Sequence, residues 1–155
     1  MSEIAVRIVK LDCMRVASAY GFGDSPEAIA HEKMVNFLKV RGMLDGYGTK
    51  YPSYGFNNPN PSAGSPNYGY EIWVPVEADV EPLGDIRIIE VPGGRYAVTR
   101  FEGLEKIGQV WRDLVTWCEN SPHRMAYHQC LEHLLNPLET DMSKYVFDLY
   151  LPIAE

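Results

Sequence analysis

The sequence lacks the features that would tie it to a disulfide framework, a membrane or a nucleic acid. Its three cysteines, Cys13, Cys118 and Cys130, have no CxxC spacing, which argues against disulfides and against a zinc site. No apolar run approaches the ~20 residues of a membrane span, and the N-terminus has no signal-peptide core. With a net charge of -7 and no cluster of Lys and Arg, we expect a cytoplasmic protein without metal, cofactor, membrane or direct nucleic-acid partner.

The size and composition fit one globular domain. At 155 residues with a hydrophobic fraction of 46%, the chain is long enough to bury a core without disulfides. We therefore expect a single domain over residues 1–155. The net negative charge is compatible with neutral or cationic binding partners, although an excess of acidic residues usually serves only solubility.

An internal repeat organises the chain. The stretch VRIVKLDCMRVASAYGFG (6–23) aligns with IRIIEVPGGRYAVTRFEG (86–103), so that Arg7 matches Arg87 and Gly23 matches Gly103. Each copy predicts a hairpin, with turns at 12–13 and at 92–94. The repeat divides the domain into halves of about 1–78 and 79–155.

A helix and two strands follow each predicted hairpin. Helical spacing of apolar residues runs from Pro26 to Gly42 and from Leu104 to Asn120. Strand patterns follow at 53–58 and 68–76 in the first half, and at 129–136 and 145–153 in the second. The sequence therefore predicts an α+β fold of two pseudo-symmetric β-β-α-β-β halves, with a mainly antiparallel sheet and helices covering one face.

The last strand of each half places an acid and an aromatic ring on one face. In YGYEIWVPV, Glu71 and Trp73 alternate with an aliphatic set, and in YVFDLYLPI, Asp148 and Tyr150 do the same. The aliphatic sets suit the helices. If a two-fold axis relates the halves, the acid-and-ring sets face one another across a cleft at the junction.

A further acid, Glu132, lies inside the apolar strand CLEHLL. Alternation puts it on the same face as Cys130 and Leu134. An acid there is unfavourable unless it reaches solvent, a partner or a ligand. A carboxylate among rings favours a lipophilic cation, whereas the alternative is an edge-strand Glu that simply points to water.

At these residues the sequence resembles the GyrI-like small-molecule-binding family, the effector-binding domain of AraC-type and MerR-type regulators of multidrug response. The marks are PGGRYAVTRFEG (92–103), the helix with Trp111, CLEHLLNP (130–137) and DLYLPI (148–153), and they span essentially the whole chain. The resemblance implies a ligand cleft between the halves. It also implies that Glu132, Asp148 and Tyr150 contact lipophilic cationic or aromatic compounds; Glu71, Trp73 and Leu134 are added as ligand-binding residues by symmetry and alternation.

The resemblance leaves three functions open. The first is a binding module for lipophilic cationic or aromatic small molecules, in which this chain is the pocket domain alone, since residues 1–24 already belong to the first hairpin. The second is a hydrolase of cyclopropane-bearing genotoxins, with Glu132 activating water and Tyr150 or another tyrosine donating a hydrogen bond. The third is a protein-interaction module that inhibits a DNA topoisomerase, although no run of acids mimics nucleic acid here.

Overall fold

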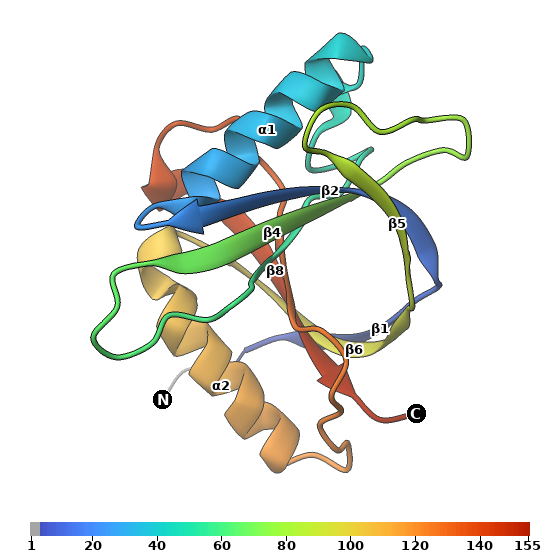
Figure 1. The fold of residues 1–155 in the computed structure, drawn as a ribbon. Helices are drawn as coiled ribbons and strands as arrows, with labels where there is room; N and C mark the ends of the chain where they lie inside the picture. Colours follow the sequence, from blue (N-terminus) through green and yellow to red (C-terminus); the bar gives the residue numbers. More distant parts are fainter. Residues whose placement is uncertain (1–3) are drawn as a thin grey trace.

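The computed structural model describes residues 4–155 as one eight-stranded sheet with two α-helices (Figure 1). The first half of the chain contributes β1 (Val6–Leu11), β2 (Met14–Gly23), α1 (Pro26–Val40), β3 (Tyr54–Asn57) and β4 (Tyr68–Pro75). The second contributes β5 (Arg87–Val91), β6 (Gly94–Glu102), α2 (Ile107–Glu119), β7 (Leu131–Leu134) and β8 (Val146–Ile153). Short 3-10 helices lie at η1 (Leu44–Gly46), η2 (Leu104–Lys106) and η3 (Met142–Lys144). The α+β class and the element order are as the sequence predicts.

The helices begin and end where local chemistry favours it. Pro26 stands in the first turn of α1, where its missing N–H is no loss, and Glu27 lies at the positive end of the helix dipole. The helix ends before Gly42, whose φ of 70° lies in the left-handed region that glycine adopts easily. Helix α1 buries Met34 and Leu38 against the sheet, and α2 buries Leu114 and Cys118.

The predicted hairpins do not form, because the two halves exchange their first strands. The sheet order is β1-β6-β8-β7-β3-β4-β2-β5, so β1 pairs with β6 and β5 pairs with β2, both antiparallel. Residue patterns identified the strands but carried no information on which strand pairs with which. Gly93, in the turn between β5 and β6, lets this turn pack closely against the end of β1, because a Cβ at this position would lie 1.8 Å from the carbonyl oxygen of Leu11.

The strand order is palindromic in terms of the repeat. The repeat counterparts are β1 and β5, β2 and β6, β3 and β7, and β4 and β8. Exchanging the members of each pair turns the observed order into β5-β2-β4-β3-β7-β8-β6-β1, which is the observed order read from the opposite edge of the sheet. A two-fold relation between the halves gives this order. The rotation itself, and the domain limits of 1–155, stay predictions, and residues 1–3 lie outside the described part of the chain.

Cross-strand registers define the two faces of the sheet. Ile72, Gly55, Glu132 and Leu149 are successive neighbours across β4, β3, β7 and β8. Because Ile72 packs with α1 and Leu149 with α2, both helices cover this face, as predicted. The opposite face carries an aromatic cluster, defined here as Tyr54, Phe56, Tyr96, Val98, Leu131 and Tyr150, with Trp73 packed against it.

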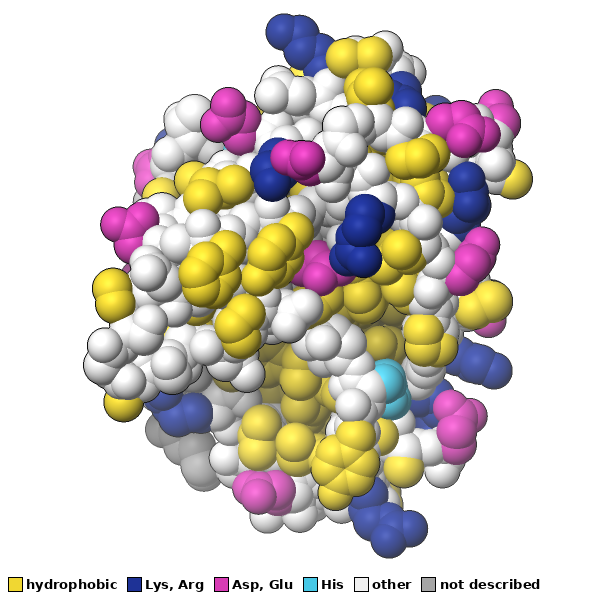
Figure 2. Space-filling view, in the orientation of Figure 1, with side chains coloured by type: hydrophobic (Ala, Val, Ile, Leu, Met, Phe, Trp, Pro, Cys, Tyr) yellow, Lys and Arg dark blue, Asp and Glu magenta, His cyan; other side chains and the backbone are white. Residues whose placement is uncertain are grey.

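The face of the molecule in Figure 2 carries both signs of charge. Acidic and basic side chains are interspersed at its edge and in its upper half, and hydrophobic side chains gather in its lower middle part. Within residues 4–155, neither helix has the length and apolarity that crossing a membrane requires. The same residues bring together no group of three or more His, Cys, Asp or Glu suited to a metal ion.

Candidate functional site

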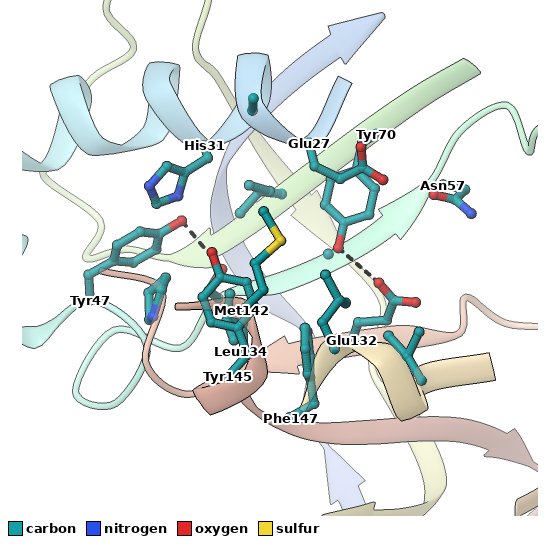
Figure 3. Close-up of a pocket in the computed structure, with 17 residues that line it drawn as sticks. Glu27, His31, Tyr47, Asn57, Tyr70, Glu132, Leu134, Met142, Tyr145 and Phe147 are labelled. Atoms are coloured by element: carbon teal, nitrogen blue, oxygen red, sulfur yellow. Dashed lines mark hydrogen bonds between the residues drawn. The ribbon is translucent and has the colours of Figure 1, made fainter. Parts of the chain in front are cut away.

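A cavity of about 470 Å³ lies on the helix-covered face, between the two halves of the chain (Figure 3). Strands β3, β4, β7 and β8 form its floor, with Ile72, Leu134 and Phe147 among the apolar lining residues. The first turns of α1 and the η2 and η3 regions form its walls. Its aromatic side chains are Tyr47, Tyr70, Tyr145 and Phe147. This is a mostly apolar pocket with a few convergent polar groups, the usual form of a small-molecule site.

Glu132 of β7 is the acid in the floor of this cavity. The Tyr70 hydroxyl donates to its Oε1 at 3.0 Å, and the Trp111 indole N–H donates to its Oε2 at 3.2 Å. The carboxylate is therefore held between β4 and α2 by two rings. Hydrogen bonds from neutral donors fix its position and leave its negative charge uncompensated.

Gly55 is required for this arrangement. It lies on β3 between β4 and β7, opposite Ile72 on one side and Glu132 on the other. A Cβ at this position would lie 2.1 Å from the Tyr70 hydroxyl oxygen. The missing side chain thus leaves the space through which Tyr70 reaches over β3 to Glu132.

Burial dominates the electrostatics of Glu132. Desolvation raises the pKa of its carboxyl above the ordinary 4.5, and the negative charge of Glu27 acts in the same direction. The hydrogen bonds from Trp111 and Tyr70 favour the ionised form and oppose the shift. The pKa of Tyr70 is raised well above 10, first by burial and then by the nearby Glu132, so its hydroxyl remains a donor.

The α1 wall adds one more acid and one imidazole. Glu27 is exposed, and its two carboxylate oxygens share one bifurcated hydrogen bond from the Tyr68 hydroxyl, at 2.8 and 2.6 Å. His31 stacks on Tyr47 with ring centroids 6.1 Å apart, and burial lowers the pKa of His31 below 6.5. At neutral pH this histidine therefore adds no positive charge to the cavity.

Within residues 4–155, no Lys or Arg neutralises the cavity. Among the lining residues that the structure describes, none is Lys or Arg. The ion pairs found within residues 4–155 involve Asp148, Asp85 and Glu71, and neither Glu132 nor Glu27 takes part in one. The cavity therefore presents negative charge to whatever enters it.

Only part of the residue set predicted from the sequence meets at this cavity. Glu132 and Leu134 line it, and they share a face as alternation requires. Glu71, Trp73, Asp148 and Tyr150 also share a face, but it is the opposite one. The reason is register, because Glu132 pairs with Leu149 and not with Asp148 or Tyr150 across β7 and β8. The six residues thus do not converge on one cavity.

The two acids of the opposite face have partners within the protein. Asp148 accepts hydrogen bonds from Arg7 at 2.7 Å and from Arg100 at 2.8 and 3.0 Å. Burial alone would raise the pKa of Asp148, but these two guanidinium groups outweigh it and lower the pKa below 3.8. Asp148 therefore joins β1, β6 and β8 as a structural ion pair.

Glu71 is satisfied in a similar way. Ser18 Oγ and the Trp73 indole N–H donate to it at 2.7 and 2.6 Å, and Asn58 donates at 3.3 Å. Arg87 lies 3.7 Å away. The acid-and-ring pattern that stood out in the sequence is thus explained by contacts within the protein.

Several residues that line the cavity or hold its acid had no distinctive signal in the sequence. Tyr70 belongs to the apolar set expected to face the helices, and Trp111 fits an ordinary helix core. Glu27 looks like a residue that favours the start of a helix. The one signal that could have pointed to Tyr70 is a polar hydroxyl placed within an otherwise aliphatic face, since such a group needs a partner when buried.

Comparison with known proteins places the chain among small-molecule-binding domains. A model of the GyrI-like small molecule binding domain matches residues 4–154. No curated protein sequence matches the chain significantly.

Solved structures share the fold at low identity. The EcmrR C-terminal domain superposes with a TM-score of 0.68 at 11% identity, covering 98% of this chain and 98% of that one. A hydrolase from Listeria innocua gives 0.65 at 13%, covering 99% and 94%. SAV2435 bound to tetraphenylphosphonium gives 0.57 at 14%, covering 97% and 94%.

Proposed function

Because the chain belongs to the GyrI-like small molecule binding domain family, we propose that its cavity binds lipophilic cationic or aromatic compounds, with Glu132 as the counter-charge. The observation that carries this proposal is the carboxylate of Glu132, held by Tyr70 and Trp111 and without a cationic partner in the described chain. The tetraphenylphosphonium bound by SAV2435 is a ligand of this chemical class.

The physical argument rests on where the charge lies. An organic cation with apolar substituents loses little hydration when it enters a pocket, and it gains from aromatic faces by roughly 0.5–2 kcal/mol per contact. The attraction to Glu132 is strengthened by the reduced local dielectric of the cavity. A metal ion or a small ammonium would lose far more hydration in the same place, so the site favours large, soft cations.

The test is calorimetric titration with tetraphenylphosphonium and with neutral triphenylphosphine oxide. Glu132→Gln is expected to weaken the cation by about 1–3 kcal/mol, or about 5- to 150-fold in Kd, while the neutral compound changes little. Glu119→Gln, on the last turn of α2 and exposed, is the matched control for loss of one negative charge. An equal loss for both compounds, or no loss for either, contradicts the proposed role of Glu132.

A second candidate function is hydrolysis, favoured by the hydrogen-bonded pair of Tyr70 and Glu132 in the cavity and by the likeness to the Listeria innocua hydrolase. In this candidate Glu132 activates a water molecule and a tyrosine hydroxyl donates to the substrate. Tyr70 lies beside Glu132 in the cavity, whereas Tyr150 lies on the opposite face of the sheet; in this candidate the Tyr70 hydroxyl, which donates to Glu132 in this structure, turns to the substrate. The test is release of a ring-opened product from a cyclopropane-bearing substrate. Loss of this product in Tyr70→Phe, while tetraphenylphosphonium still binds, would support the hydrolase function.

A further inference from the structure

The cavity contains a second carboxylate, Glu27, which cation binding at Glu132 does not require. Glu27 belongs to the first turn of α1 and lines the cavity. Tyr68 donates its hydroxyl to both carboxylate oxygens, at 2.8 and 2.6 Å. Because the Glu27 side chain is exposed, this tyrosine is what holds its carboxylate toward the cavity.

The two carboxylates are held by the same device. Tyr68 and Tyr70 stand two positions apart on β4, so they point to the same face and are about 7 Å apart along the strand. Tyr68 donates to Glu27, and Tyr70 donates to Glu132. Figure 3 shows Glu27 descending from α1 beside the Tyr70 ring, with Glu132 on the far side of the Tyr70 hydroxyl. One acid therefore lies near the exposed rim and the other at the floor.

These two carboxylates line one cavity, and the charge of Glu27 acts on Glu132. Burial is the main reason for the raised pKa of Glu132, and the charge of Glu27 adds to it. Neither acid has an ion-pair partner within residues 4–155. A ligand with one positive group compensates one of the charges, whereas a ligand with two compensates both.

Resting on the proposed cation-binding function, we propose that Glu27 determines specificity and that the preferred ligands are aromatic dications, with one positive group at Glu132 and the second at Glu27. The aromatic spacer would lie along Tyr70 and the apolar lining between the two acids. Because Glu27 is exposed, water and salt screen its contribution. The preference for dications therefore decreases as the salt concentration rises.

The test uses a matched pair of probes with soft quaternary heads, p-xylylenebis(trimethylammonium) and (4-methylbenzyl)trimethylammonium, which share the ring and differ by one charge. For the wild-type chain, calorimetry is expected to give a dication preference of about tenfold, which combines one partly exposed ion pair with two equivalent ends. Glu27→Gln is expected to reduce it to the statistical factor of the two ends, with (4-methylbenzyl)trimethylammonium affinity retained. Tyr68→Phe is expected to give an intermediate ratio, because the charge stays and its tether is lost.

The control is Glu32→Gln, an exposed acid of the same helix that does not line the cavity, and it is expected to keep the wild-type ratio. A wild-type protein without the preference, or a preference that survives Glu27→Gln, overturns the inference. If tetraphenylphosphonium still binds in a Glu132-dependent manner in that case, the proposed function stands alone. If tetraphenylphosphonium also fails to bind, both fail.

Discussion

Tyr70 and Glu132 are 62 positions apart in the chain and meet in a hydrogen bond of 3.0 Å across β3, the strand that separates their own. The contact is possible because Gly55 of β3 lies beneath it and has no side chain. It joins the two halves of the chain at the floor of the cavity.

Gly55→Ala is expected to displace the Tyr70 ring, because the new Cβ would lie 2.1 Å from its hydroxyl oxygen. The displaced hydroxyl no longer favours the ionised carboxylate, so the pKa of Glu132 should rise further. NMR titration of the Glu132 carboxyl carbon measures this shift. Tyr70→Phe should raise the pKa in the same direction. Gly108→Ala in α2, where a Cβ meets nothing closer than 3.7 Å, should leave it unchanged.

Cation binding should weaken on mild acidification. Because burial raises the pKa of Glu132 above 4.5, the carboxyl takes up its proton at a higher pH than an ordinary Glu. Protonation removes the counter-charge, so tetraphenylphosphonium affinity should fall as the pH drops through this raised pKa, and the bound cation should lower that pKa. Titrations from pH 8 to pH 4 measure the profile. A profile of the same steepness in Glu132→Gln would assign the effect to other groups, such as His31.

Asp148→Asn should destabilise the fold and leave the cavity unaffected. The substitution removes the charge that Arg7 and Arg100 share, and we expect a loss of about 1–3 kcal/mol of unfolding free energy, moderated because both arginines are about half exposed. Since the folded-state pKa is lowered, the stability from this group is present above 3.8 and is lost as the pH falls through the lower folded value. Urea unfolding at pH 7 and pH 3 measures both effects.

Two comparisons make the Asp148 experiment decisive. Asp85→Asn removes an exposed acid 3.6 Å from Lys33 and should change stability by less than about 0.5 kcal/mol. Tetraphenylphosphonium affinity should stay within about twofold in folded Asp148→Asn, because Asp148 lies on the other face of the sheet. A large loss of affinity in a fully folded variant would return Asp148 to the ligand site that the sequence predicted.

Gly93→Ala should destabilise the fold at the contact between the β5–β6 turn and the end of β1. A Cβ here would lie 1.8 Å from the carbonyl oxygen of Leu11, and backbone on both sides cannot move as a side chain would. We expect a loss of about 2–3 kcal/mol of unfolding free energy by chemical denaturation. Gly108→Ala, at a helical position with room for a methyl group, should instead be neutral or stabilising by up to about 1 kcal/mol. An equal change in unfolding free energy for Gly93→Ala and Gly108→Ala would contradict the steric explanation for Gly93.

Period and repetition in the sequence were enough to predict much of the fold. The helix from Pro26 follows from its capping chemistry and apolar spacing, and β4 and β8 follow from alternation. The pairing of β1 with β6 could not be predicted, because both halves carry similar strands and either partner satisfies the same pattern.

The candidate site was predicted only in part for a related reason. Glu132 stood out because an acid inside an apolar strand needs an explanation, and Leu134 followed by alternation. Tyr70 and Trp111 carried no such contrast, since a ring on a helix-facing side is ordinary core. Asp148 and Glu71 stood out equally, but partners from distant strands account for them.

The sequence by itself determined which residues share a face within each strand, because side-chain alternation is a local property of extended backbone. It also determined that one acid would lie among apolar neighbours in β7. Only the tertiary structure decided which face of β7 continues which face of β8, since that depends on a register set by long-range pairing. The register of Glu132 with Leu149 directs the acid to the cavity between the helices and leaves Asp148 and Tyr150 on the other side.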